Sequence, residues 1–179
     1  MNIQKKIKTI LLLLVVSTLF ISCKDTSKTN NDDTEHTSVF YLIRHAEKDR
    51  SDATNKNPSL TTQGIERAKK WGVLFKNKKI DAVYSTNYNR TRQTALPIAK
   101  NNNLEIISYR PKQFITEEFI QNNKGKHIVI VGHSNTTPQL VNRLLGEKKY
   151  DDIPDGDNND LFIVTHTKNT VTSKREKVH

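Results

Sequence analysis

The sequence lacks three features that would each have decided its architecture. It has one cysteine, Cys23, so no disulfide can form within the chain. It shows no internal repeat with a period of about 20 to 50 residues, the signature of solenoids and propellers. Its longest hydrophobic run, Ile10–Ile21, is about a dozen residues long, which is too short to span a bilayer. At 179 residues, the chain is expected to form one globular domain with appendages.

Acidic residues are few relative to basic ones. The chain has 19 Asp and Glu against 29 Lys and Arg, and its formal net charge is +10. A charge of this size calls for a test of nucleic-acid binding. However, no aromatic residues interleave with the lysines to form a stacking surface, so we expect no nucleic-acid partner. The charge instead indicates a solvated surface with a bias toward anionic substrates. The scattered lysines are Lys76, Lys78, Lys79, Lys124, Lys126, Lys148 and Lys149.

The N-terminus has the pattern of an export signal. Three lysines precede the apolar run Ile10–Ile21, which predicts a signal peptide over residues 1–22. Cys23 follows directly after Ser22, and this boundary resembles a bacterial lipobox, in which the cysteine is lipidated and becomes the mature N-terminus. Ordinary secretory cleavage and an uncleaved anchor are the alternatives. Residues 23–37 are polar without apolar periodicity and are predicted to be a flexible tether. We therefore expect an exported domain, anchored to a bacterial membrane through Cys23.

Residues 38–168 are predicted to form the domain, because strand and helix patterns alternate along them. The sequence favours an α/β fold: a three-layer α/β/α sandwich on a mostly parallel sheet. Residues 169–179 are predicted to be a polar tail. The expected strands are 39–43, 80–84, 104–108, 127–132 and 161–165. Helical patterns begin near Thr61, carry Arg90 to Ala95, begin again near Phe114, and follow Asn135.

Polar side chains follow three of the expected strands. Arg44 and His45 end the first, Ser85 ends the second with Arg90 one turn into the next helix, and His133 follows the clearest strand. Because parallel strands bring their carboxyl ends to one edge of a sheet, these side chains are expected to converge there. Two arginines beside two histidines would form a cationic pocket suited to a phosphoryl group.

Four segments together resemble the histidine phosphatase superfamily, also called the phosphoglycerate mutase-like proteins. They occur in the order and spacing of that family: Ile43-Arg44-His45-Ala46-Glu47, Leu60-Thr61-Thr62-Gln63-Gly64, Tyr84-Ser85-Thr86 with Arg90-Thr91-Arg92-Gln93-Thr94-Ala95, and Val131-Gly132-His133-Ser134. The resemblance implies that His45 is the nucleophile that accepts the phosphoryl group. It implies that Arg44 and Arg90 bind the phosphate oxygens, and that His133 completes the pocket. Ser85 is expected to bind the phosphate as well.

No metal and no other cofactor is expected. His45 and His133 could suggest a metal site, but no neighbouring carboxylate or cysteine completes a ligand set, and two arginines would repel a cation. The same arginines disfavour a second positive charge, so they are expected to keep His45 neutral and nucleophilic. They also supply the positive charge that phosphoryl transfer needs.

The proton donor for the leaving group is the open part of the site. In many relatives it is a Glu between the second Arg and the second His, which makes Glu117 and Glu118 the candidates, with Glu105 in the same interval. Glu47, directly after the nucleophile segment, is another. Asn135 stands where the other branch of the family has an Asp, which argues against a phytase-like acid site. Relatives that act on phosphohistidine need no acid, because that leaving group is good.

The expected function is therefore that of a phosphatase, working through phosphohistidine on His45 and acting on a phosphomonoester or a phosphoramidate. The domain has no room for the long insertions of the mutases, which favours hydrolysis. The alternative is a catalytically weak lipoprotein that keeps the pocket to bind phosphate or another anion. The expected partners are a small phosphorylated substrate and, through Cys23, the membrane.

Overall fold

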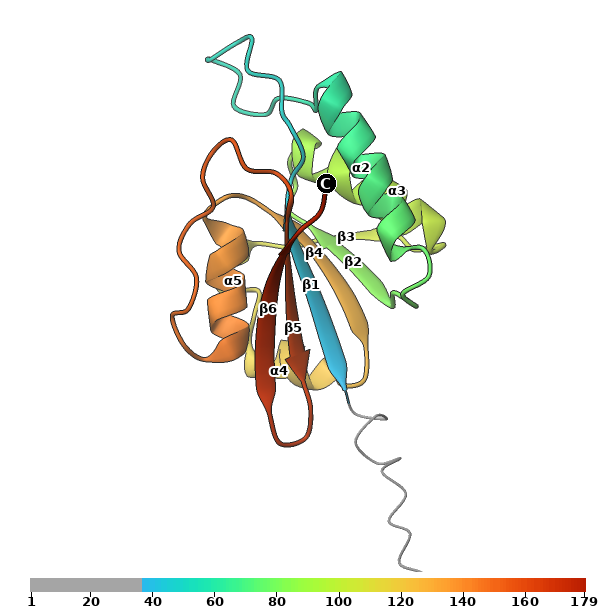
Figure 1. Cartoon of the computed structure of the whole chain (residues 1–179), viewed down its shortest axis with the longest axis vertical. Helices are drawn as coiled ribbons and strands as arrows, with labels where there is room; N and C mark the ends of the chain where they lie inside the picture. Colours follow the sequence, from blue (N-terminus) through green and yellow to red (C-terminus); the bar gives the residue numbers. More distant parts are fainter. Residues whose placement is uncertain (1–36) are drawn as a thin grey trace, which may run out of the picture. The chain divides into compact units, whose positions relative to one another are not determined.

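A computed structural model describes residues 37–179 (Figure 1). The predicted signal peptide, the lipidation site Cys23 and residues 24–36 of the tether lie outside the described residues. Within residues 37–179, no helix is both long enough and apolar enough to cross a membrane.

The domain is built on one six-stranded sheet with the strand order β3-β2-β4-β1-β5-β6. The first four strands in this order are parallel, β5 runs antiparallel to β1, and β6 runs antiparallel to β5. The fold is thus α/β with a mostly parallel mixed sheet, as the sequence predicts. The strands are β1 (Ser38–Arg44), β2 (Ala82–Ser85), β3 (Ile106–Ser108), β4 (His127–Gly132), β5 (Asp160–His166) and β6 (Val171–Lys177).

Alternation along β1 explains the layers, since successive side chains of a strand point to opposite faces. Tyr41 and Ile43 pack into one apolar cluster, whereas Phe40 and Leu42 pack into another on the opposite face. Helices cover both faces, so the three-layer expectation is confirmed (Figure 1). On the Tyr41 face lie α2 (Thr62–Phe75) and α3 (Asn89–Asn101); on the Phe40 face lie α4 (Glu117–Asn122) and α5 (Thr136–Leu145), with a 3₁₀ turn at Pro111–Gln113.

The start of α2 is pressed against the segment that follows β1. The Thr61 side chain accepts a hydrogen bond from the Gly64 amide, and the Thr61 amide donates to the Glu47 carbonyl at 2.9 Å. A Cβ at Gly64 would lie 2.2 Å from the Glu47 carbonyl oxygen, which only glycine avoids. The Leu-Thr-x-x-Gly motif therefore holds the backbone just beyond Arg44 and His45.

The predicted polar tail is not a tail. Val171–Lys177 forms β6, which pairs with β5 along its whole length. Its side chains are mostly exposed, so the strand has no hydrophobic alternation by which it could be recognised. It is fixed instead by charge: Arg175 donates to both oxygens of Asp160, at 2.7 Å each, and the Asp160 side chain is fully buried. The helical pattern over 114–122 also shortens, to α4.

Candidate active site

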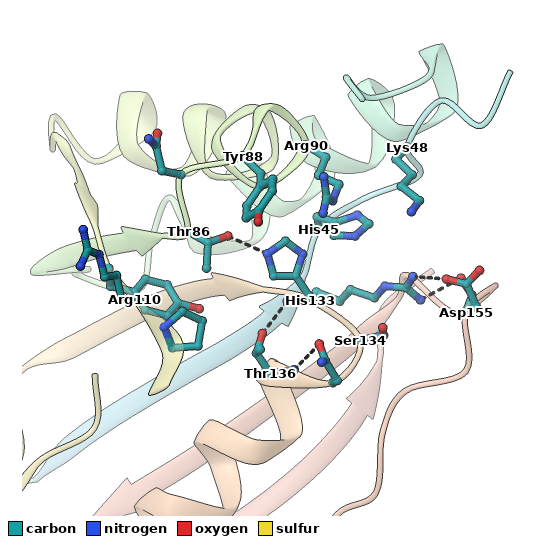
Figure 2. A pocket seen from close by; sticks show the side chains of 15 residues that line it. His45, Lys48, Thr86, Tyr88, Arg90, Arg110, His133, Ser134, Thr136 and Asp155 are labelled. Atoms are coloured by element: carbon teal, nitrogen blue, oxygen red, sulfur yellow. Dashed lines mark hydrogen bonds and ion pairs between the residues drawn. The ribbon is translucent and has the colours of Figure 1, made fainter. Parts of the chain in front are cut away.

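A cavity of about 690 Å³ opens at the carboxyl ends of the parallel strands (Figure 2). Arg44 is the last residue of β1 and His45 follows it, Thr86 follows β2, and His133 follows β4. Arg90 enters from the first turn of α3. The convergence expected from the sequence is thus present for four side chains. The cavity is lined by Arg44, His45, Lys48, Thr86, Asn87, Tyr88, Arg90, Tyr109, Arg110, Pro111, His133, Ser134, Asn135, Thr136 and Asp155.

His45 is buried, with 3% of its surface exposed, and its tautomer is set by the backbone. Nδ1 lies 2.7 Å from the Ala46 carbonyl oxygen, so Nδ1 carries the proton and donates it. This leaves a lone pair on Nε2. Burial lowers the pKa of His45 to about 3 against the opposing effect of the Ala46 carbonyl, and the charges of Arg44 and Arg90 lower it further. His45 therefore presents a neutral, nucleophilic nitrogen at neutral pH.

His133 stands beside it, with the two ring centroids 5.6 Å apart. Its Nε2 lies 2.9 Å from the Thr86 hydroxyl oxygen, and its backbone amide donates to the Thr136 hydroxyl at 3.1 Å. Burial lowers the pKa of His133 to about 4, and the nearby Arg90 and Arg44 add to the shift. Both imidazoles are therefore uncharged when the cavity is empty.

These two pKa values predict acid-sensitive stability. An unfolded histidine titrates near 6.5, so between pH 7 and pH 5 the unfolded chain takes up protons that the folded site refuses. Stability then falls as pH falls, by about 2 kcal/mol for each histidine over that interval. Urea unfolding at pH 5, 6 and 7 measures the slope, and His45→Ala is expected to reduce it by about half. A slope that is the same in both proteins would contradict the assignment.

Arg44 is held from one side by a loop of the chain's C-terminal third. Its Nη1 lies 2.8 to 3.0 Å from the carbonyl oxygens of Pro154, Asp155 and Asp157, and its Nη2 donates to the Asp155 carboxylate at 2.8 Å. The Asn158 amide donates to the carbonyl of His45 at 2.8 Å. Segment 154–158 therefore fixes both the guanidinium of Arg44 and the backbone of the nucleophile His45.

Three N–H groups of the two site arginines are buried without a partner: Nε of Arg44, and Nε and Nη1 of Arg90. Each unpaired buried donor lowers the stability of the fold by about 1 to 3 kcal/mol, so its presence indicates a functional role. The Arg90 guanidinium also lies over the Tyr88 ring, at 4.5 Å from its centroid. Two arginines with spare N–H donors beside a neutral imidazole suit a tetrahedral oxyanion.

Asp155 is the one carboxylate in the cavity lining. Its Oδ1 accepts from Arg44 at 2.8 Å and its Oδ2 from Arg50 at 2.9 Å. These hydrogen bonds, from Arg50 first and Arg44 second, lower the pKa of Asp155 to about 2. Asp155 is therefore ionised at neutral pH and has no proton to give.

The expectation that Glu117 or Glu118 reaches the pocket is not met. Both begin α4 and are exposed, and neither lines the cavity; Glu117 bonds to Gln121 at 2.7 Å and lines a separate hollow with Ser38, at the opposite end of β1. The helix is only six residues long and starts too far from the strand ends. Glu105 is exposed and also outside the lining.

Glu47 is occupied elsewhere. Both its carboxylate oxygens accept hydrogen bonds from Arg67 of α2, at 2.8 and 3.0 Å. Burial by itself would raise the pKa of Glu47, but the Arg67 hydrogen bonds outweigh it and the net pKa is below the usual value. Glu47 thus orients the segment after the nucleophile and lies outside the cavity lining.

Ser85 is also placed differently from the prediction. It is fully buried, its hydroxyl donates to the Thr86 carbonyl at 2.9 Å, and it does not line the cavity. The strand ends one residue later than the pattern indicated, so Thr86 takes the position facing His133. Sequence reasoning missed Thr86, Lys48, Tyr88 and Asp155. The sequence carries a signal for only one of them, Thr86, which belongs to the motif Tyr84-Ser85-Thr86.

The described residues offer no metal centre: residues 37–179 contain no group of three His, Cys, Asp or Glu side chains placed to hold an ion. The donors around His45 and His133 are guanidinium groups, which repel cations.

Residues 40–112 match the model of the histidine phosphatase superfamily (branch 1). The matched segment includes Arg44, His45 and Arg90, whereas His133 lies beyond it. No curated protein matches the sequence. The family match supports this superfamily over the matched segment, and the solved structures support the fold.

Solved structures of histidine phosphatases share the fold at low identity. A protein histidine phosphatase, SixA, complexed with tungstate, is 15% identical with a TM-score of 0.60, covering 78% of this chain and 96% of that one. Phosphoglycerate mutase from Bacillus anthracis str. Sterne is 14% identical with a TM-score of 0.60, covering 81% and 94%. The alpha-ribazole phosphatase from Shigella flexneri is 15% identical with a TM-score of 0.57, covering 78% and 96%. These neighbours establish the phosphoglycerate mutase-like fold.

Proposed function

We propose that this chain is a metal-independent phosphatase that transfers a phosphoryl group to Nε2 of His45 and then releases it to water. The observation that carries the proposal is a neutral imidazole, protonated on Nδ1, that lines one cavity with two arginines whose side chains keep buried nitrogens without a hydrogen-bond partner. The superfamily match supports a phosphatase in general terms.

The chain's own groups account for each step. Free N–H groups of Arg44 and Arg90 bind the phosphoryl oxygens and stabilise their charge in the transition state. Nε2 attacks phosphorus while the bond to the leaving group breaks, and the Ala46 carbonyl stabilises the cationic ring through Nδ1–H. Water then attacks phospho-His45, which regenerates the imidazole. His133, held by Thr86, forms the opposite wall and positions the phosphoryl group.

The substrate class follows from the leaving group. We propose a small phosphomonoester or a phosphoramidate, because the cavity of about 690 Å³ is much larger than a phosphoryl group. The lining contains no carboxyl that is protonated at neutral pH, which favours leaving groups that depart readily. One structural neighbour is named a protein histidine phosphatase and another an alpha-ribazole phosphatase, so both chemistries occur on this fold.

The cellular setting remains a proposal from the sequence alone. The signal pattern over residues 1–22 and Cys23 support export and lipid anchoring at a bacterial membrane.

The test is an assay of the full chain on 2,4-dinitrophenyl phosphate and on phosphoramidate after treatment with a chelator. We expect turnover to survive chelation, and a quenched reaction to contain phosphoenzyme that is stable to alkali and labile to acid. His45→Ala, with its fold verified by circular dichroism, is expected to lose both signals. Full activity in that variant would refute the mechanism.

The second candidate, a protein that only binds phosphate, is favoured by the lack of a free carboxyl acid in the lining. It predicts binding of inorganic phosphate by calorimetry, lost in Arg44→Ala, with no turnover of either compound.

A further inference from the structure

The cavity lacks the acid that most phosphate esters need. Expulsion of an alkoxide or phenoxide is slow unless a nearby group protonates the oxygen as the P–O bond breaks. Asp155 is ionised, Glu47 is bound to Arg67, and both histidines are neutral when the cavity is empty. An acid that is charged at neutral pH, such as an ammonium group, is the remaining kind of donor.

Lys48 is placed to be that acid. Figure 2 shows its side chain extending from the loop after β1 toward the space between His45 and Asp155. Its backbone is fixed by a bridge to Leu60, beside a 2.8 Å hydrogen bond from the Asp49 amide to the Ser59 carbonyl. The base of the side chain is therefore anchored while its end lies in the cavity.

The Lys48 ammonium makes no hydrogen bond or ion pair with any side chain or backbone group of residues 37–179. The carboxylate that lines the cavity with it is Asp155, whose two oxygens are already taken by Arg44 and Arg50. A lysine tied to a carboxylate would be a structural cation, whereas this one has three N–H donors to spare. The group is free to contact a substrate.

The charges around Lys48 favour proton release. Burial lowers its pKa, and Arg50 of the same loop, Arg90 of α3 and Arg44 of β1 lower it further, while Asp155 opposes them. Lys48 in turn lowers the pKa of His133 at the end of β4, so the ammonium acts on the same site. A lysine in this position is a stronger acid than a solvated one.

We propose that Lys48 is the general acid, giving a proton from Nζ to the leaving oxygen as His45 Nε2 forms its bond to phosphorus. The P–O bond pair passes to the leaving oxygen, which departs as an alcohol, and Lys48 is left as a neutral amine. In the second step water attacks phospho-His45, the P–N bond pair returns to the imidazole, and the amine takes the water's proton. Phosphate leaves and Lys48 is charged again. This inference rests on the proposed phosphatase mechanism.

The experiment compares two esters on the full chain: phenyl phosphate, whose leaving group needs a proton, and 2,4-dinitrophenyl phosphate, whose leaving group does not. Lys48→Arg keeps the positive charge but holds its protons far more tightly. We expect kcat/KM for phenyl phosphate to fall about a hundredfold in this variant, and that for the dinitrophenyl ester to change less than about threefold. The alkaline limb of the kcat profile for phenyl phosphate should move to higher pH.

Two further variants separate proton donation from charge and from a rival donor. Arg110→Gln removes a positive charge from the same cavity lining and is expected to change both esters by the same factor. Tyr88→Phe removes a phenol hydroxyl from the same lining, a rival proton donor, and should leave the ratio of the two esters unchanged.

Each result separates the role of Lys48 as the acid from the phosphohistidine mechanism. If wild type hydrolyses only the dinitrophenyl ester, or if Lys48→Arg affects both esters equally, Lys48 is not the acid and the phosphohistidine mechanism stands. A change of ratio in Tyr88→Phe instead of Lys48→Arg would assign the role to Tyr88. No turnover of either ester by wild type would overturn both the phosphatase and the acid.

Discussion

Replacing Arg90 by Met is expected to reduce kcat/KM about a thousandfold and to make the protein more stable. Arg90 offers two buried N–H groups that no other group of residues 37–179 accepts, and a bound phosphoryl group would accept both. Removing an arginine that stabilises transition-state charge costs about 10³ to 10⁵ in rate. Removing unpaired buried donors should raise the free energy of unfolding of the empty protein by about 1 kcal/mol.

Steady-state kinetics on 2,4-dinitrophenyl phosphate and urea unfolding measure the two effects in one preparation. The matched control is Arg92→Met, because Arg92 lies two residues further along α3, is exposed and contacts Ser108 at 3.3 Å. We expect it to change kcat/KM less than about threefold and stability by less than about 0.5 kcal/mol. A stable, fully active Arg90→Met would mean that the cavity is not the phosphoryl site.

Replacing Arg175 of β6 by Met is expected to lower the free energy of unfolding by about 3 kcal/mol. The Asp160 side chain is fully buried, and Arg175 supplies hydrogen bonds to both of its oxygens. Losing one partner of a buried ion pair leaves an uncompensated charge, which costs about 3 to 5 kcal/mol. Lys177, at 2.9 Å from Asp160 Oδ1, remains and keeps the cost at the lower end.

Urea unfolding measures the loss, and two variants test its cause. In the double variant Asp160→Asn with Arg175→Met the buried charge is gone, so about half of the stability should return. Lys174→Met breaks an exposed pair with Glu176 on the same strand and should cost less than about 0.5 kcal/mol. Equal losses in Arg175→Met and Lys174→Met would show that strand pairing, and not the buried carboxylate, holds β6 to the sheet.

The C-terminal strand also bears on the site. Lys177 pairs with Asp157 as well as Asp160, and the Asp157 carbonyl accepts from Arg44. Loosening β6 therefore loosens the segment that holds the nucleophile. Arg44 and Asp157 are more than a hundred positions apart. The sequence cannot predict this contact, because the acceptor is a backbone carbonyl and every residue type has one.

Much of the core of the site was predictable. A buried strand appears in the sequence as an apolar run. A polar pair directly after such a run, as at Arg44 and His45, is therefore predicted to lie at the end of the strand. His133 after β4 follows the same rule, and Arg90 follows from helical spacing. The predicted parallel core, β1 to β4, follows from alternation of strand and helix patterns, and the structure confirms it.

Each wrong prediction has its own physical cause. Successive side chains of a strand point to opposite faces, so an error of one residue in the strand end selects Ser85, whose hydroxyl bonds to the backbone, in place of Thr86, whose hydroxyl contacts His133. Glu117 and Glu118 were placed by order along the chain, but α4 begins after a connection whose length does not reveal its direction. The strand β6 carries no apolar pattern, because most of its side chains are exposed.

The sequence by itself determined the fold class, the two arginines and the two histidines, because hydrophobic periodicity and strand ends are local properties. Only the tertiary structure decided the tautomer of His45 and the hydrogen bonds from Arg44 to segment 154–158. It also decided the ion pairs that exclude Asp155 and Glu47 as acids, and it left the ammonium of Lys48 free. The tautomer depends on the local backbone geometry that brings the Ala46 carbonyl to Nδ1, and the others depend on distances between residues separated in the chain, which packing sets and no local pattern encodes.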